Sequence, residues 1–262
     1  MDLVTMTLYT ALVDDAGLFP PTSLHMSDAL DRHRRDQERG SPVLTHRFLC
    51  PAGRLDRLRA EPFRPRRIGV ILDTPEPPDL GDLPVDLAEV KLPPERSVEE
   101  LARELLPRLP QGVRLFVEVS PTKFVSDVPE GVGLKVRCGG ARPEEFPQAE
   151  QLGSFIRFCV AGDIPFKATA GLHHAVRHFD PALGVDRHGF LNLLVAVCEA
   201  VEGRDPVPAL RATDVGQLVR MARAVPEQTA KRARHLLVSY GSCNTATPLD
   251  DLKTLRLIEE DV

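Results

Sequence analysis

The sequence has no segment suited to crossing a membrane or to directing export. It contains no run of about 18 apolar residues, the length that a membrane-spanning helix needs. Its first residues, Met1–Thr7, lack the basic region followed by an apolar stretch that marks a secretory signal peptide. We therefore expect a cytoplasmic protein with no membrane partner.

The chain has few cysteines and no excess of positive charge. The five cysteines are odd in number and show no CxxC spacing, which predicts free thiols in a reducing compartment. The net charge of -5 and the pI near 5.9 argue against a nucleic-acid partner, so any cationic site must be local. The rest of the composition, with 42% hydrophobic and 27% charged residues, is that of a globular chain.

The chain of 262 residues is close to the typical size of a (β/α)8 barrel, roughly 250 residues. Eight short apolar or alternating runs predict strands, and helix-like stretches between most of them indicate a parallel sheet. We predict a single (β/α)8 TIM-type barrel over residues 1–262. The predicted strands are 4–13, 43–50, 67–73, 86–92, 113–120, 133–138, 165–170 and 236–241.

Two features of the predicted helices add detail to this barrel. Ser97 and Glu100 have the spacing of a capping box, which predicts the start of a helix after the fourth strand. The gap 173–235 is about twice the usual length for a barrel of this kind. It contains apolar helix-like stretches at 189–201 and 215–224, so we predict a helical insertion between strands seven and eight.

The segment Asp163–His174 has the pattern of a strand that ends in a site. Lys167 and Thr169 alternate with apolar residues, so one face is apolar and the other is polar. A turn follows, and then the adjacent His173 and His174. Burying a lysine in the middle of a strand is costly unless its charge is paired or it has a functional role. This strand therefore marks a candidate functional site.

Three other predicted strands repeat this pattern of one apolar and one charged face. Helices would cover the apolar faces of a parallel sheet, so the charged faces would point into the closed barrel. Active sites of such barrels lie at the carboxyl ends of the strands. We therefore predict that these side chains share one space there. The inward-facing charged residues are Glu89, Lys91, Glu118, Lys135, Arg137 and Lys167.

Lys135 and Lys167 would face inward on neighbouring strands. A second cation lowers the pKa of a lysine, and burial lowers it further, so that a neutral amine can attack a carbonyl and form a Schiff base. Two other interpretations stay open. The lysines can pair with Glu89 and Glu118 as a structural network, or they can bind an anion.

The run Leu134–Gly140 followed by Phe166–Leu172 resembles the deoxyribose-phosphate aldolase group of class I aldolases. The resemblance covers about 40 residues, on strands six and seven. It implies that Lys135 forms the Schiff base and that Lys167 lowers its pKa. The sequence departs from the family after strand seven, where His173 and a second histidine follow in place of the family's Gly-Gly-Ile turn.

Other polar residues follow the predicted strand ends. Asp15 comes after strand one, and Ser242 and Asn244 come after strand eight in a small, donor-rich run typical of a phosphate or carboxylate site. Between them, Cys243 would be a nucleophile if a histidine lay beside it, although such a cysteine is more often simply packed.

The adjacent pair His173 and His174 suggests a metal site at first sight. Neighbouring residues of an extended chain point apart, and the sequence has no HxH, HExxH or Cys/His cluster. A site would need one of them together with Asp15, Glu118 or Cys243. We therefore predict no metal and no cofactor, and take His173 as a candidate general acid or base.

These observations leave three functions open. The first is a Schiff-base lyase or aldolase that acts on a small anionic carbonyl compound. The second is a non-covalent barrel enzyme for an anionic or phosphate substrate, such as phosphoribosyl transfer, and the third is a non-catalytic ligand-binding barrel. The expected partner is a small anionic metabolite, and a homo-oligomer is compatible with the sequence. The catalytic candidates are Lys135, Lys167, Glu118 and His173, and the substrate-binding candidates are Asp15, Lys91, Arg137, Thr169, His174, Ser242 and Asn244.

Overall fold

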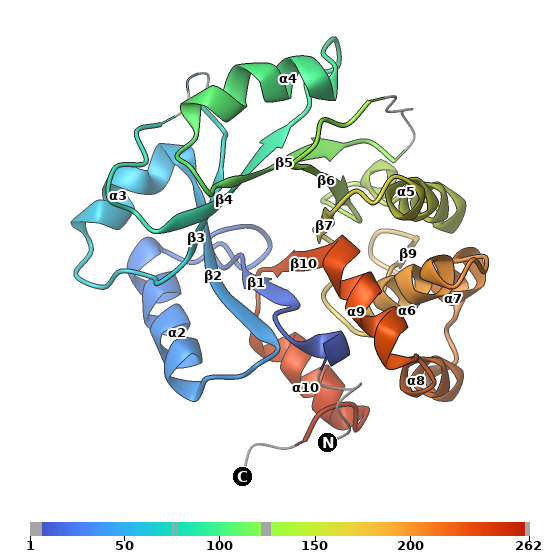
Figure 1. Cartoon of the computed structure of the whole chain (residues 1–262). Coiled ribbons are helices and arrows are strands. Elements are labelled where there is room, and N and C mark those ends of the chain that lie inside the picture. The colour runs from blue at the N-terminus through green and yellow to red at the C-terminus, as the bar shows by residue number, and fades with distance from the viewer. Residues whose placement is uncertain (1–6, 75, 77, 122–126, 260–262) are drawn as a thin grey trace.

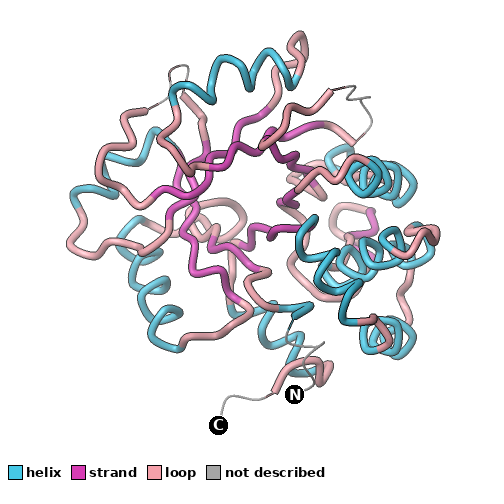
Figure 2. Tube along the Cα trace, in the orientation of Figure 1, coloured by secondary structure: helices cyan, strands magenta, loops and turns pink. Residues whose placement is uncertain are grey.

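Eight parallel strands close into a barrel, and helices surround it (Figure 1 and Figure 2). The strands are β1 (Val13–Asp15), β2 (Leu44–Pro51), β3 (Ile68–Ile71), β4 (Val85–Lys91), β5 (Arg114–Val119), β6 (Val132–Arg137), β7 (Phe166–Thr169) and β10 (Leu237–Ser242). Their hydrogen-bonded order is β1, β10, β7, β6, β5, β4, β3, β2, with β2 closing on β1. This computed structural model describes residues 7–74, 76, 78–121 and 127–259. The predicted (β/α)8 barrel is confirmed.

The first strand differs from its prediction. Residues 7–9 form a helical turn, and the strand begins only at Val13, while residues 4–6 of the predicted strand lie outside the described residues. Leu8, Tyr9 and Leu12 are all buried, each at most 2% exposed. Leu8 and Tyr9 lie next to each other in the helical turn and are both buried, whereas a strand would point them in opposite directions. The prediction mistook a short apolar helical segment for a strand.

Helices lie around the outside of the barrel (Figure 1). Those outside the predicted insertion are α2 (Met26–Arg39), α3 (Leu55–Ala60), α4 (Val98–Leu105), α5 (Ala149–Ala161) and α10 (Ala246–Thr254), with short 3-10 turns η1 (Ala52–Arg54), η2 (Leu106–Arg108) and η3 (Pro143–Glu145). Apolar side chains of the strands and helices pack together between these two layers. The hydrophobic core therefore lies outside the barrel.

The predicted capping box is present at the start of α4. The Ser97 side chain accepts a hydrogen bond from the Glu100 N–H at 3.1 Å, and the Glu100 carboxylate accepts one from the Ser97 N–H at 3.0 Å. Replacing Ser97 with Ala is expected to lower the free energy of unfolding by about 1 kcal/mol, because the first turn loses a side-chain acceptor. Urea unfolding measures this. Ser154, an exposed residue within α5, is the control, since Ser154→Ala should cost nothing.

The insertion between β7 and β10 is confirmed. It begins with an antiparallel hairpin of β8 (His178–Asp180) and β9 (Val185–Arg187), which the sequence did not predict, and continues with α6 (Phe190–Val201), α7 (Val207–Arg211), α8 (Val215–Arg223) and α9 (Glu227–Leu236). Helix α6 contacts α5, α7, α8 and α9, which explains why it is apolar on most sides. None of the helices in the described ranges is long and apolar enough to cross a membrane.

The interior of the barrel is polar over much of its length. On β5 and β6, the outward Val117 and Leu134 are fully buried in the core between strands and helices. The alternate residues Glu118 and Lys135 point inward and are also buried, at 8% and 6% exposure. The alternation read from the sequence therefore assigns the two faces of these strands correctly.

Candidate functional site

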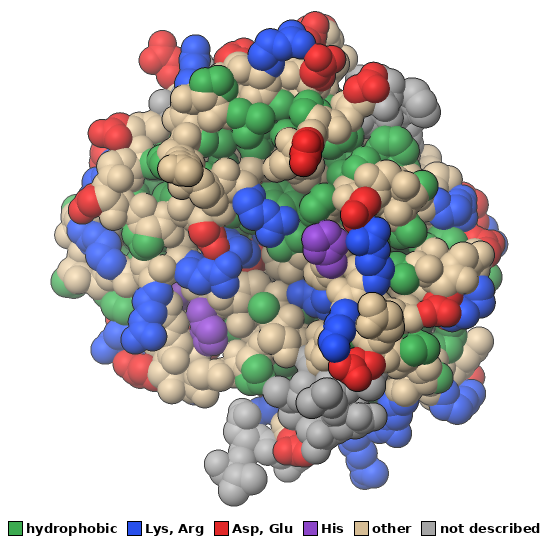
Figure 3. Space-filling model, in the orientation of Figure 1, with side chains coloured by type: hydrophobic (Ala, Val, Ile, Leu, Met, Phe, Trp, Pro, Cys, Tyr) green, Lys and Arg blue, Asp and Glu red, His purple; other side chains and the backbone are tan. Residues whose placement is uncertain are grey.

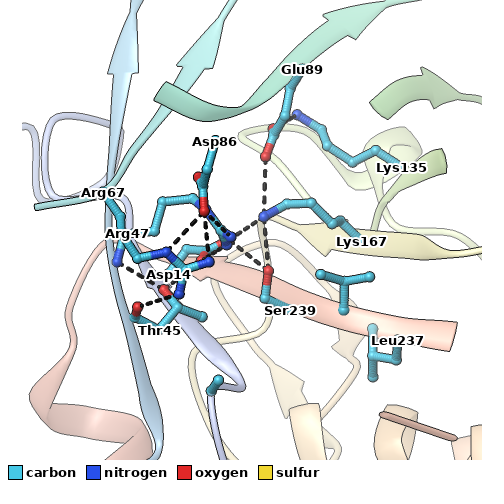
Figure 4. A network of polar contacts seen from close by, with 12 residues as sticks. Asp14, Thr45, Arg47, Arg67, Asp86, Glu89, Lys135, Lys167, Leu237 and Ser239 are labelled. Carbon is cyan, nitrogen blue, oxygen red and sulfur yellow. Dashed lines mark hydrogen bonds and ion pairs between the residues drawn. The ribbon is translucent and has the colours of Figure 1, made fainter. Parts of the chain in front are cut away.

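The centre of the barrel is occupied by the Lys167 ammonium group (Figure 4). Lys167 is 1% exposed and binds the carboxylate of Asp14 on β1 and the hydroxyl of Ser239 on β10, the latter at 2.8 Å. Its Nζ also lies 3.3 Å from Oε1 of Glu89 on β4. One lysine thus joins four strands, which explains how a charge can be buried in the middle of a strand.

Toward the carboxyl ends of the strands, the contacts continue through Lys135. Its Nζ lies 2.6 Å from Glu89 Oε2 and 2.9 Å from Glu118 Oε2. Glu118 Oε1 then accepts a hydrogen bond from Arg137 Nε at 3.1 Å. The two lysines therefore hold the two oxygens of the same Glu89 carboxylate.

Toward the amino ends, the contacts continue through Asp14 to Arg47. Arg47 Nη1 donates to Asp14 at 2.8 Å, and its Nε donates to Asp86 at 2.7 Å. Asp86 also accepts from Arg67 at 2.6 Å, and Thr45 donates to Asp14 at 2.6 Å. Thr45, Arg47, Arg67 and Asp86 were not among the predicted site residues. Thr45 and Arg47 are separated by His46 and not by an apolar residue, so this strand lacks the clear alternation that located the lysines.

Together these residues form one chain of alternating charges, which we call the barrel network. In order from the amino to the carboxyl ends of the strands, it consists of Arg67, Asp86, Arg47, Asp14, Lys167, Glu89, Lys135, Glu118 and Arg137. It holds five cations and four carboxylates, which leaves one positive charge in excess. The side chains at its two ends, Arg67 and Arg137, are 45% and 43% exposed, so the excess charge is accessible from either opening.

The network fixes the charge states of its members. Burial alone would raise the pKa of Asp14, but the charges of Lys167 and Arg47 hold it well below its usual range. Burial likewise opposes the charge of Glu118, yet Lys135 and the neighbouring arginine lower its pKa. These carboxyl groups are therefore ionised at neutral pH.

The pKa of Lys135 is raised, whereas the sequence analysis expected a neighbouring cation to depress it. Burial favours the neutral amine, but Glu89 and Glu118 together outweigh burial and stabilise the ammonium form. The depressed pKa belongs to one of the interpretations left open by the sequence. The structure supports another of them, in which Glu89 and Glu118 pair with the lysines and separate the two cations. Lys135 carries its proton in this structure.

The six side chains expected to share one space divide into two groups. Four of them, Glu89, Glu118, Lys135 and Lys167, meet inside the barrel as predicted. Arg137 reaches the same network but is half-exposed, and Lys91 is exposed at the carboxyl end of β4. We use "carboxyl mouth" for the opening at the carboxyl ends of β4 to β7 and β10.

Asp15 does not face the barrel interior. Its carboxylate binds Arg32 and lies 3.0 Å from Nδ1 of His33, both on α2, and accepts the Gly17 N–H at 3.0 Å. Because side chains alternate along a strand, Asp14 and Asp15 point in opposite directions, and only Asp14 enters the network. Asp15 anchors α2 to the barrel.

The expected anion cup after β10 has its polar groups engaged locally. The Ser242 hydroxyl donates to the carbonyl of Asn244 at 2.6 Å, and the Asn244 side chain accepts from the Ala246 N–H at 3.0 Å. These contacts shape the turn between β10 and α10. Thr169, by contrast, is half-buried on β7 and paired in register with Arg137 of β6.

The two adjacent histidines have different partners, as their opposite orientations predicted. His173 Nδ1 lies 3.7 Å from the sulfur of Cys243, and burial together with Arg187 lowers its pKa. His174 Nδ1 lies 3.3 Å from the carboxylate of Asp251. Within the described residues, no group of three or more His, Cys, Asp or Glu side chains is placed to hold a metal ion. All five cysteines are free thiols, as predicted, and buried.

Two glycines hold the ends of β6 and β7 together. A Cβ atom on Gly139 would lie 2.8 Å from the Cα of Gly171, and one on Gly171 would lie 2.8 Å from the carbonyl oxygen of Cys138. Gly171 also has a φ of 74°, which favours glycine. These glycines permit close backbone contact at the carboxyl mouth and place the segment that carries His173.

A cavity of about 660 Å³ lies at the opposite, amino-terminal end of the barrel. Its walls come from the start of β5, the segment before β1, and the junction of α9 with β10. Arg114, Arg234 and His235 line it. Figure 3 shows this face, on which basic side chains gather around the centre. The sequence analysis assigned no role to these three residues.

Comparison of the chain with models of protein families and with curated proteins found no match. The function of the site therefore has to be argued from the contacts of its own residues. The resemblance of strands six and seven to the aldolase group stays a prediction.

Proposed function

We propose that the chain is a barrel enzyme that binds a small anionic metabolite at the carboxyl mouth and acts on it without a covalent bond to lysine. The observation that carries this proposal is the composition of the barrel network. It has one cation more than it has carboxylates, and its end at the mouth is the half-exposed Arg137. A carboxylate or phosphate bound to this guanidinium would balance the excess charge and accept two parallel hydrogen bonds.

His173 is the group best suited to move a proton in such a reaction. Its lowered pKa keeps the imidazole neutral at physiological pH, the form that accepts a proton as a general base. Glu118 is less suited, because its oxygens are held by Lys135 and Arg137. We therefore assign anion binding to Arg137 with Thr169 beside it, and proton transfer to His173.

A Schiff-base lyase is the second candidate, and one observation favours it. Lys135 and Lys167 are register partners on neighbouring strands and both point inward, as the aldolase resemblance implies. Each amino group, however, lies against two carboxylates, and those around Lys135 raise its pKa. A substrate would have to displace a carboxylate such as Glu89 before either amine could attack a carbonyl.

Arg137→Gln is expected to weaken the binding of small phosphorylated or carboxylated carbonyl compounds about tenfold or more, because it removes the cation at the mouth. Binding is measured by calorimetric titration of a panel of such compounds. Arg142→Gln is the matched control, since Arg142 is 73% exposed and follows the same strand. Equal binding by wild type and Arg137→Gln would exclude this arginine as the anion site.

Borohydride trapping with the same panel separates the two candidates. We expect no covalent adduct on the wild-type protein by intact mass, because the pKa of Lys135 is raised and the Lys167 amino group is engaged by Asp14 and Glu89. An adduct that is lost in Lys135→Arg or Lys167→Arg would overturn the non-covalent proposal and establish the second candidate.

A further inference from the structure

The cavity at the amino-terminal end of the barrel contains an arginine that has no carboxylate partner among the residues that the structure describes. Arg234, at the end of α9, donates to the backbone carbonyls of Ala11 and Val238 at 2.9 Å and of Thr10 at 3.2 Å, and also to that of Leu237. Its Nε is fully enclosed and has no hydrogen-bond acceptor. Burial lowers the pKa of Arg234 to about 10. The hydrogen bonds of this half-buried guanidinium go to backbone carbonyls, and an anion in the cavity would compensate its charge further.

A second arginine faces the same cavity from the other side of the barrel. Arg114 begins β5, and its guanidinium lies over the ring of Phe116, 5.1 Å from the centroid. Burial and the charge of Arg47 both disfavour the cation and lower its pKa, while Asp86 opposes them only in part. Within the described residues, no carboxylate lies at ion-pair distance from Arg114.

The third basic side chain is already paired. His235 Nε2 lies 3.7 Å from Asp163, which also binds Arg232 at 2.8 Å. The unbalanced positive charge of the cavity therefore comes from the two arginines. The remaining wall includes the apolar Ala11 and Val238, and the volume lies within the range of roughly 300–1,000 Å³ found for small-molecule sites.

We propose that this cavity is a second binding site of the protein, for a small organic anion whose phosphate or carboxylate group meets Arg114 and Arg234. The apolar part of the ligand packs against Ala11 and Val238. The site lies at the opposite opening of the barrel from Arg137, so it does not depend on the function proposed for the carboxyl mouth. Its occupant neutralises a charge for which the described residues supply no carboxylate at ion-pair distance.

Calorimetric titration of the protein with phenyl phosphate at low salt tests the proposal. Arg114→Gln is expected to weaken binding about tenfold or more, because one of two charge-assisted contacts is lost. Arg114 is exposed and contacts mainly one ring, so this variant keeps its fold, which thermal unfolding verifies. Arg220→Gln, the same charge change on the exposed side of α8, should bind like the wild type.

Arg137→Gln distinguishes the two openings of the barrel. Phenyl phosphate binding that survives in Arg137→Gln and is lost in Arg114→Gln assigns the ligand to the amino-terminal cavity. Binding that is lost only in Arg137→Gln, or no saturable binding by the wild type, would overturn the proposal for the cavity. Neither of these results would decide whether the carboxyl mouth is a catalytic site.

Discussion

Replacing Lys167 with Met is expected to lower the free energy of unfolding by about 3–5 kcal/mol, the range for breaking a buried ion pair by removing one partner. Met keeps most of the length of the side chain, so the principal loss is the charge. The Asp14 and Glu89 carboxylates, 0% and 2% exposed, would stay buried with less compensation. Asp14 keeps Arg47 as a partner, and Glu89 keeps Lys135. The fold is therefore weakened and not abolished.

Lys231 supplies a matched control for this prediction. Its Nζ lies 2.6 Å from Glu227 on the exposed side of α9, and Lys231→Met should cost about 0.5 kcal/mol or less. Urea unfolding of both variants gives the comparison. The double variant Asp14→Asn with Lys167→Met should lose less than the sum of the single variants, because each removes the unpaired charge that the other leaves. Equal losses for Lys167→Met and Lys231→Met would contradict the buried network.

Stability is expected to fall steeply as the pH drops below about 4, the ordinary pKa of an unfolded carboxyl group. The pKa values of Asp14, Asp86 and Glu118 are lower in the fold, because their cations outweigh the effect of burial. Groups of this kind stabilise the fold above their unfolded pKa, and the contribution is lost as the pH falls toward the folded value. Each unit by which the folded pKa lies below the unfolded pKa corresponds to about 1.4 kcal/mol of stability.

Other groups define the rest of the pH profile. The lowered pKa of His173 and of His188, both caused mainly by burial, adds a loss of stability as the pH falls below about 6.5. The raised pKa of Lys135 acts in the other direction. Its contribution is complete below about 10.4 and is lost as the pH rises through the folded value. Burial also raises the pKa of four cysteine thiols, so stability is lost as the pH rises above about 8.5, the ordinary value for cysteine. We therefore expect maximal stability between about 6.5 and 8.5.

Urea unfolding across this pH range measures the profile. Asp14→Asn should reduce the loss of stability at acid pH, since it removes the carboxyl group that lies deepest in the network. Asp56→Asn is the control, because the Asp56 side chain is 99% exposed. An acid limb in Asp14→Asn as steep as that of the wild type would show that other groups cause the loss.

Much of this architecture could be predicted from the sequence, because alternation has a period of two and so reports which face of a strand is buried. The inward positions of Lys135 and Lys167 followed from this rule alone. Glu89 and Glu118 were named as their partners in one of the interpretations left open, and these contacts are present. The contact of Lys167 with Asp14 was not predicted, since the two residues are 153 positions apart and no local pattern encodes it. The raised pKa of Lys135 depends on which carboxylates surround it.

The remaining differences have local causes. Asp15 and Ser242 were expected in the site because they are near strand ends. Asp15 has the wrong parity for the interior, and Ser242 donates to its own turn. The hairpin of β8 and β9 consists of strands of three residues, too short to give a recognisable alternation. The helical turn at residues 7–9 is similarly short. For both the hairpin and this turn, the pattern is shorter than the window that periodicity requires.

The long separations within the network also bear on the order in which the barrel can form during synthesis. Asp14 leaves the ribosome early, whereas its partners Lys167 and Ser239 follow 153 and 225 residues later. Until β7 and β10 are made, the carboxylate at the centre of the barrel has only Thr45 and Arg47 as partners, and it stays hydrated. An incomplete chain therefore lacks the charges needed to exclude water from the interior. Closure of the barrel is thereby tied to translation of its last strand, and premature collapse of the first half is disfavoured.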